Sequence, residues 1–218
     1  MQIDFAGRTA LVTGSTLAAH PDRRLQVRRP AEETRRHILD VAGDLFYSRG
    51  VRAVGMDLVI GTAGVANATL YRQFANKDEL VTAYLVSRNE HWWQRLREAA
   101  AAAPSPRARI KALFDLTRQD MAAPGYRGCA TLNITSEFPD ADHPAHAAAV
   151  AHKTEVQTWL SEQLRAAGDA NPDDTAGKLL VILDGAQVLA AAMATDTPGD
   201  HMIQLAEQLL DARLPAPL

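Results

Sequence analysis

The chain has 218 residues, of which 47% are hydrophobic and 22% charged, a composition typical of a soluble globular protein with one large domain or two small ones. Its single cysteine, Cys129, excludes an internal disulfide and a cysteine-rich zinc site, and it fits a reducing compartment such as the cytoplasm. The net charge of −3 is uneven, with 11 Lys and Arg against 9 Asp and Glu over residues 1–80 and 12 against 17 over the rest.

The N-terminal stretch RTALVTGST, residues 8–16, resembles the first strand and glycine-rich turn of short-chain dehydrogenases. That turn requires further glycines for the approach of a dinucleotide, but Leu17 to His20 supply none. No tyrosine of the chain has a lysine four residues later, which is the catalytic pair of that family. We therefore expect residues 1–29 to be a flexible appendage and the protein not to be an enzyme. An NAD(P)-binding dehydrogenase fragment with a parallel sheet remains the less favoured alternative.

From Pro30 onward the pattern is helical almost throughout, with no alternation of strands and helices, so we expect an all-α protein. Proline, glycine and capping residues divide it into about nine helices. These are expected at about 30–49, 56–63, 66–74, 76–103, 105–123, 131–138, 144–167, 172–194 and 199–213.

Two short helices joined by a glycine turn, residues 63–66, are a helix-turn-helix signature. In the second of them Val65, Leu70 and Phe74 can face inward while Asn67 and Tyr71 share the outer face. Asn76 can cap the next helix, with Glu79 three residues later able to reach back toward it. An exposed helix face held by its neighbours is what a reader of the DNA major groove needs.

Residues 34–80 resemble the DNA-binding domain of the TetR family of transcriptional regulators. The resemblance rests on TRRHILDVA, the following Leu45, Phe46 and Gly50, and above all on AGVANATLYRQF followed by KDEL. It implies a helix-turn-helix domain at residues 30–78, then a larger helical domain at 79–218 for effector binding and dimerisation. It also implies a homodimer that binds double-stranded DNA at a palindromic operator, most commonly as a repressor in the cytoplasm, associated with the nucleoid.

The resemblance places Tyr71, Gln73 and Lys77 at phosphate-contacting positions and Asn67, Ala68 and Thr69 near the base edges. Asparagine can pair with adenine, and a threonine methyl can touch a thymine methyl. We expect Arg28 and Arg29, in a cluster of four arginines before the first helix, to form a basic arm that supports binding.

Several positions depart from the family pattern and favour weaker binding. Ala66 replaces a capping side chain, Asn67 replaces a frequent lysine, and Gly61 should weaken the second helix by up to about 1 kcal/mol. A helical interaction module whose helix-turn-helix no longer binds DNA is therefore an open alternative.

In the larger domain we expect a small-molecule effector to bind and the last two helices to dimerise. The candidate pocket residues are Trp92, Trp93, Phe114, Met121, Cys129, Asn133 and Phe138. The candidate dimer residues are Leu180, Leu183, Val188, Leu205 and Leu209, because helices this apolar must be buried on several sides.

Neither a metal, a cofactor nor a membrane is expected. His143, His146 and His152 are spaced by three and six residues, which does not place all three on one helix face, and no cysteine completes a site. The apolar stretch from Leu179 to Ala194 is short for a membrane span and contains Asp184.

Overall fold

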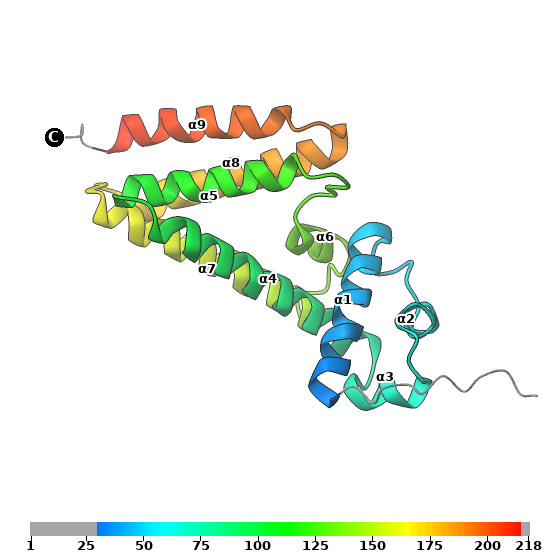
Figure 1. The fold of residues 1–218 in the computed structure, drawn as a ribbon. Coiled ribbons are helices and arrows are strands. Elements are labelled where there is room, and N and C mark those ends of the chain that lie inside the picture. The colour runs from blue at the N-terminus through cyan, green and yellow to red at the C-terminus, as the bar shows by residue number, and fades with distance from the viewer. Residues whose placement is uncertain (1–29, 215–218) are drawn as a thin grey trace, which may run out of the picture.

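The structure is a computed structural model that describes residues 30–214. Over this range the chain forms nine α-helices and no strand, which confirms the all-α class (Figure 1). The helices are α1 (Ala31–Arg49), α2 (Met56–Ala63), α3 (Asn67–Gln73), α4 (Lys77–Ala101), α5 (Pro106–Met121), α6 (Ala130–Glu137), α7 (Pro144–Ala166), α8 (Pro172–Met193) and α9 (Thr197–Arg213). The dehydrogenase-like stretch and the expected basic arm lie outside the described residues.

Helix α4 connects the two ends of the elongated molecule (Figure 1). One hydrophobic core fills the space among α1, α2, α3 and the beginning of α4 up to Leu85, and it also takes in Ile134 of α6 and Ala145 of α7. A second core begins at Leu96 on the same helix and extends among α5, α7, α8 and α9. The change from one core to the other therefore falls inside α4, so this helix is rigidly held at both ends.

The helix ends follow the local signals to within one or two residues, the usual spread for helix boundaries. Pro30 precedes α1 with ψ 152° instead of occupying its first position. Asn76 caps α4, its side chain accepting the Glu79 N–H at 2.8 Å. The Glu79 carboxylate accepts the N–H of Ala75 at 2.8 Å, one residue before the expected cap position. Helix α9 begins two residues earlier than expected, with Pro198 in its first turn.

Among the described residues, α8 is the one helix long and apolar enough to cross a membrane by length and composition. It packs between α7 and α9, and Leu179 and Leu183 are buried there. It also carries Asp184, which pairs with Lys153 of α7 at 2.5 Å while both side chains are largely buried. Packing on two sides and a charged partner are features of a core helix, so the composition of α8 is weak evidence for a membrane span.

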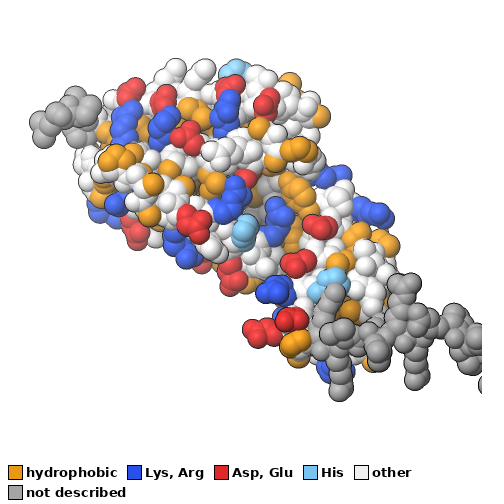
Figure 2. Space-filling view, viewed as in Figure 1, with side chains coloured by type: hydrophobic (Ala, Val, Ile, Leu, Met, Phe, Trp, Pro, Cys, Tyr) orange, Lys and Arg blue, Asp and Glu red, His pale blue; other side chains and the backbone are white. Residues whose placement is uncertain are grey.

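Three ion pairs join α5 to α9 along one side of the molecule, where Figure 2 shows basic and acidic side chains alternating. They are Arg107–Asp211 at 2.5 Å, Lys111–Glu207 at 2.8 Å and Arg118–Asp200 at 2.5 Å. Because these side chains are exposed, each pair contributes at most about 1 kcal/mol. Their role is to favour one alignment of the two helices.

Candidate nucleic-acid interface and ligand cavity

The turn between α2 and α3 is built on Gly64, whose φ of 63° and ψ of 32° are left-handed and end α2. A left-handed residue at this place is inexpensive only for glycine. The Val65 N–H then bonds back to Ile60, and α3 begins after Ala66 without a side-chain cap, as its sequence predicts. Leu70 and Phe74 are fully buried. The seven-residue α3 is therefore held by its apolar face and not by its own stability.

Side chains of α1 contact the C-terminal ends of both α2 and α3. The Arg35 guanidinium donates to the carbonyl of Gln73 at 2.5 Å and lies 4.1 Å from the centroid of the Phe74 ring. His37 Nε2 lies 2.9 Å from the carbonyl oxygen of Ala63, the last residue of α2. Because the last carbonyls of a helix have no partner within it, these contacts satisfy groups that would otherwise be open.

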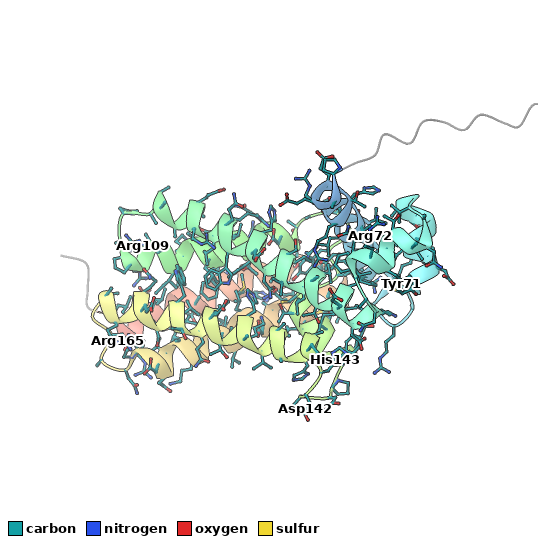
Figure 3. All side chains as sticks on the ribbon, turned by 90° about the horizontal axis from the view of Figure 1, so that it is seen from below. Tyr71, Arg72, Arg109, Asp142, His143 and Arg165 are labelled. Carbon is teal, nitrogen blue, oxygen red and sulfur yellow. The ribbon has the colours of Figure 1, made fainter. Side chains whose placement is uncertain are left out.

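The outer face of α3 carries most of the residues predicted to contact DNA. Asn67 and Ala68 are exposed, and Tyr71 is 46% exposed although it is a large aromatic residue. Thr69 and Gln73 are half-buried beside them. Figure 3 shows Tyr71 at the end of the molecule formed by α1, α2 and α3, far from Arg109 and Arg165 at the opposite end. All five predicted residues thus lie on α3 at this end of the molecule, three of them exposed and two half-buried.

Arg72 is a further candidate that the motif comparison did not single out. It is exposed on α3 and lies at the same end as Tyr71 (Figure 3). A basic residue inside a recognition helix was the signal that could have identified it. Lys77, the last of the predicted set, is half-buried at the first position of α4, where the helix N-terminus also favours a phosphate.

A cavity of about 740 Å³ lies in the larger domain and reaches α1. Its walls come from α1, α4, α5, α7, α8 and the segment 123–131. Of the seven predicted pocket residues, Trp92 and Cys129 line it. Trp93 lines a separate shallow groove between α4 and α7.

The other four predicted residues have different places, which corrects the expected lining. Phe114 and Met121 are buried in the second core. The Asn133 side chain donates to the carbonyl of Arg127 at 3.0 Å, and the Phe138 ring stacks on His143. The side chains of these four residues fill packed space or make local contacts and do not line the cavity.

Among the cavity-lining residues that sequence reasoning missed are polar aromatic ones: Tyr47 of α1, Tyr84 and His91 of α4, Tyr126 of the segment 123–131, and His152 of α7. Burial raises the pKa of Tyr84 to about 12 and also raises the pKa of Tyr126, so both are neutral hydroxyls near neutral pH. Burial, assisted by neighbouring Lys153, lowers the pKa of His152 to about 4, so its imidazole is uncharged as well.

Hydrogen bonds connect the cavity wall to the DNA-binding end. The Tyr47 hydroxyl donates to the Gly128 carbonyl at 3.0 Å and accepts the Arg127 N–H at 2.9 Å. Beyond the end of α1, the Glu137 carboxylate of α6 accepts the N–H groups of Val51 at 2.9 Å and Arg52 at 2.7 Å. These bonds join α6 and the segment 127–129 to the C-terminal end of α1 and to the residues that follow it.

Helices α8 and α9 leave an apolar surface uncovered within one chain. Val181 is 73% exposed and Met193 65% exposed, and Val188, Leu189 and Leu205 are each about half exposed. Among the predicted dimer residues, Leu180 and Leu209 are half-buried and pack against the second core. Leu183 is only 2% exposed and belongs to the core of the single chain, which corrects its place in the predicted set.

The three histidines considered for a metal site have separate environments. His143 stacks on Phe138 with Nε2 3.6 Å from Asp78, His146 contacts the Phe138 carbonyl at 2.7 Å, and His152 lies against Trp92. Within residues 30–214, no group of three or more potential ligands is placed to hold a metal ion.

A three-helix unit with an exposed, rigidly held third helix defines a helix-turn-helix DNA-binding protein. A family model described as "Bacterial regulatory proteins, tetR family" matches residues 38–84. A TetR-family transcriptional regulator from Streptomyces coelicolor is 30% identical in sequence, and the match covers 84% of this chain and 96% of that one with a TM-score of 0.80. The chain belongs to the TetR family of transcriptional regulators.

Other relatives agree with this assignment. A TetR-type regulator structure from Streptomyces avermitilis is also 30% identical, with a TM-score of 0.74 over 83% of this chain and 97% of that one. The transcriptional activator FasR of Mycolicibacterium smegmatis is 34% identical over 104 residues, 46% of this chain and 47% of FasR. The transcriptional repressor KstR2 of Rhodococcus jostii is 31% identical over 90 residues, 38% of this chain and 44% of KstR2. The chain thus matches less than half the length of these two curated relatives, which include both an activator and a repressor.

Proposed function

We propose that the protein is a homodimeric repressor that binds a palindromic DNA operator and is released from it by a small-molecule effector. The observation that carries the proposal is the geometry of α3. Its inner face is fixed by Leu70 and Phe74 while Asn67 and Tyr71 remain open to a partner. A neutral amide and a phenol on such a surface suit a base edge and a phosphate respectively.

A second copy of the chain supplies the selectivity that one short helix lacks. A dimer places two recognition helices about 34–36 Å apart, one turn of DNA, and so reads two half-sites. The apolar surface of α8 and α9 supports this proposal, because exposed Val181, Val188 and Leu205 would be covered by the same surface of the partner. A dimeric DNA-binding regulator of this kind would act in the cytoplasm, on the nucleoid.

The cavity supports the effector part of the proposal. It touches α1 through Tyr47 and α4 through Trp92, the two helices that carry the DNA-binding unit. A ligand that prefers one spacing of these helices would shift the population of binding-competent dimers, since only differential affinity moves such an equilibrium.

One alternative function is supported by particular residues. Helix α2 lacks a side-chain N-cap and contains Gly61, and Asn67 carries no charge on the outer face of α3. These features favour an interaction module with weak or no DNA binding. The dependence of DNA affinity on salt separates the two functions, because several phosphate contacts make affinity fall steeply as salt rises.

The experiment that tests the proposal is selection of bound fragments from a random DNA pool by the purified full-length chain at about 150 mM salt. We expect enrichment of a palindrome whose half-sites are one helical turn apart. If a folded dimer enriches no motif, sequence-specific regulation is excluded and the interaction module becomes the better hypothesis.

A further inference from the structure

The inner part of the cavity contains two buried polar atoms without a hydrogen-bond partner in the described chain. They are the Tyr126 hydroxyl oxygen and His152 Nδ1. His152 is 7% exposed, and both residues line the cavity. An unpaired buried polar group is costly, and the described structure contains only a few of them. Their presence on one cavity indicates a ligand that forms hydrogen bonds there.

Aromatic side chains surround His152. Trp92, which lines the cavity, lies edge-on to His152 with ring centroids 5.3 Å apart, and both contact the ring of Trp93, which lines the separate groove between α4 and α7. Tyr84 contributes a further ring to the lining. Aromatic walls of this kind favour a flat, ring-containing ligand, because ring pairs gain from edge-on and offset contacts.

Of the charged groups that line the cavity, Asp40, Asp44 and Arg88 are exposed and form no ion pair within residues 30–214, whereas the half-buried ones are each paired with an opposite charge. Arg95 pairs with Asp120 at 2.7 Å, and Lys153 pairs with Asp184 at 2.5 Å. The Arg88 guanidinium is exposed and lies 4.5 Å from the centroid of the Tyr47 ring. An ionic ligand would lose its hydration without gaining an opposite charge beside Tyr126 and His152.

We infer that this cavity binds an uncharged aromatic ligand that carries a hydroxyl group, with phenols as the chemical class. A hydroxyl both donates and accepts, so it can serve the Tyr126 hydroxyl and either tautomer of a neutral imidazole. The cavity volume of about 740 Å³ admits a molecule of two or more rings. This inference rests on the proposed function in one respect only, that the ligand acts as the effector. Binding of the ligand to the cavity requires no DNA.

The test uses three matched probes and the full-length chain without DNA. The probes are 2-naphthol, naphthalene and 2-naphthoate, which share one ring system and differ in hydroxyl and charge. Calorimetric titration should give a Kd for 2-naphthol about tenfold or more below that of either other probe. Equal or tighter binding of naphthalene or 2-naphthoate, or no binding of any probe, would overturn the inference.

Two variants connect the preference to the residues. In Tyr126→Phe the preference for 2-naphthol over naphthalene should fall by about threefold or more, while stability stays equal or rises because the lost hydroxyl has no protein partner. Thr158→Val is the control, since it removes an exposed hydroxyl of α7 that bonds only to Thr154 of its own helix. An unchanged preference in Tyr126→Phe means that the hydroxyl does not select the ligand, and the inference fails.

The failure of this inference is distinguishable from that of the proposed function. A chain that selects a palindrome but shows no preference for 2-naphthol is a regulator with a different ligand class. A chain that prefers 2-naphthol through Tyr126 but selects no DNA keeps the binding site and loses the regulatory function.

Discussion

Arg35 of α1 and Phe74 at the end of α3 form the contact that orients the recognition helix. The guanidinium lies 4.1 Å from the centroid of the ring, and its Nη1 also donates to the neighbouring Gln73 carbonyl. The planar, charged guanidinium of arginine can make both contacts at once, which the ammonium group of a flexible lysine side chain cannot. One side chain thus fixes the end of a helix that is too short to be stable alone.

Arg35→Ala should lower the free energy of unfolding by about 1–3 kcal/mol, because it removes a charge-assisted hydrogen bond and a cation–π contact. Arg35→Lys should recover only part of this loss. Urea denaturation at one fixed protomer concentration measures the effect. Arg36→Ala is the control, since Arg36 is exposed beside it. Equal stability of the two alanine variants would contradict the assigned role of Arg35.

The two glycines of the helix-turn-helix should respond oppositely to alanine. A Cβ at Gly61 meets no atom within 4 Å, so Gly61→Ala should stabilise α2 by about 0.5–1 kcal/mol. Gly64 has φ +63°, so Gly64→Ala should destabilise the chain by about 1 kcal/mol although its Cβ also has room. Thermal unfolding of the two variants measures both signs. A loss of stability in Gly61→Ala would show that glycine is needed there for another reason.

The DNA-binding end could be predicted from the sequence because its helices have local signals and residues 34–80 resemble the TetR family. Leu70 and Phe74 are four residues apart, and Gly64 ends the preceding helix at the position where a left-handed residue is needed. The same reasoning gave the nine helices of residues 30–214, because proline, glycine and capping residues separate them.

The cavity could not be predicted in the same way, because its walls come from distant parts of the chain. Tyr47, Tyr126 and His152 line one cavity only when α1, α7 and the segment before α6 have packed together. Phe114 has the same apolar spacing as a lining residue would have, but it points into packed core. Helical periodicity tells inside from outside and does not distinguish a filled interior from a hollow one.

Two substitutions on α3 should distinguish a residue that contacts the DNA backbone from a residue that selects a base. Tyr71→Phe removes the hydroxyl predicted to contact a phosphate, so affinity should fall by a similar factor for every DNA sequence. Asn67→Ala should relax the preference at one base position, at a cost of about 1–3 kcal/mol for the preferred base. Titration of the selected DNA and its single-base variants measures both effects. If neither variant changes affinity, α3 is not the recognition helix.

His152 should make the stability depend on pH below neutrality. Its pKa is about 4 in the folded chain, mainly through burial, against 6.5 ordinarily, so the unfolded chain takes up a proton first as pH falls. The free energy of unfolding is therefore unaffected by the titration of His152 above pH 6.5. It falls progressively as the pH is lowered toward 4, by about 3 kcal/mol at most. The measurement is the difference in unfolding free energy between wild type and His152→Gln at several pH values. A difference that does not change between pH 7 and pH 4 would contradict the neutral buried histidine.

The proposed dimer depends on the apolar surface of α8 and α9, which charge should disrupt. Val181 is 73% exposed in the single chain, so Val181→Glu should leave the fold intact but place a carboxylate inside the interface. Because an unpaired buried charge is costly, dimer affinity should fall by about tenfold or more. Sedimentation measures the change, and helicity checks the fold.

Val150→Glu is the matched control, since Val150 is 50% exposed on α7, outside the α8–α9 surface. A palindrome-binding dimer should lose DNA affinity together with dimerisation in Val181→Glu alone, whereas equal effects of both substitutions would place the interface elsewhere.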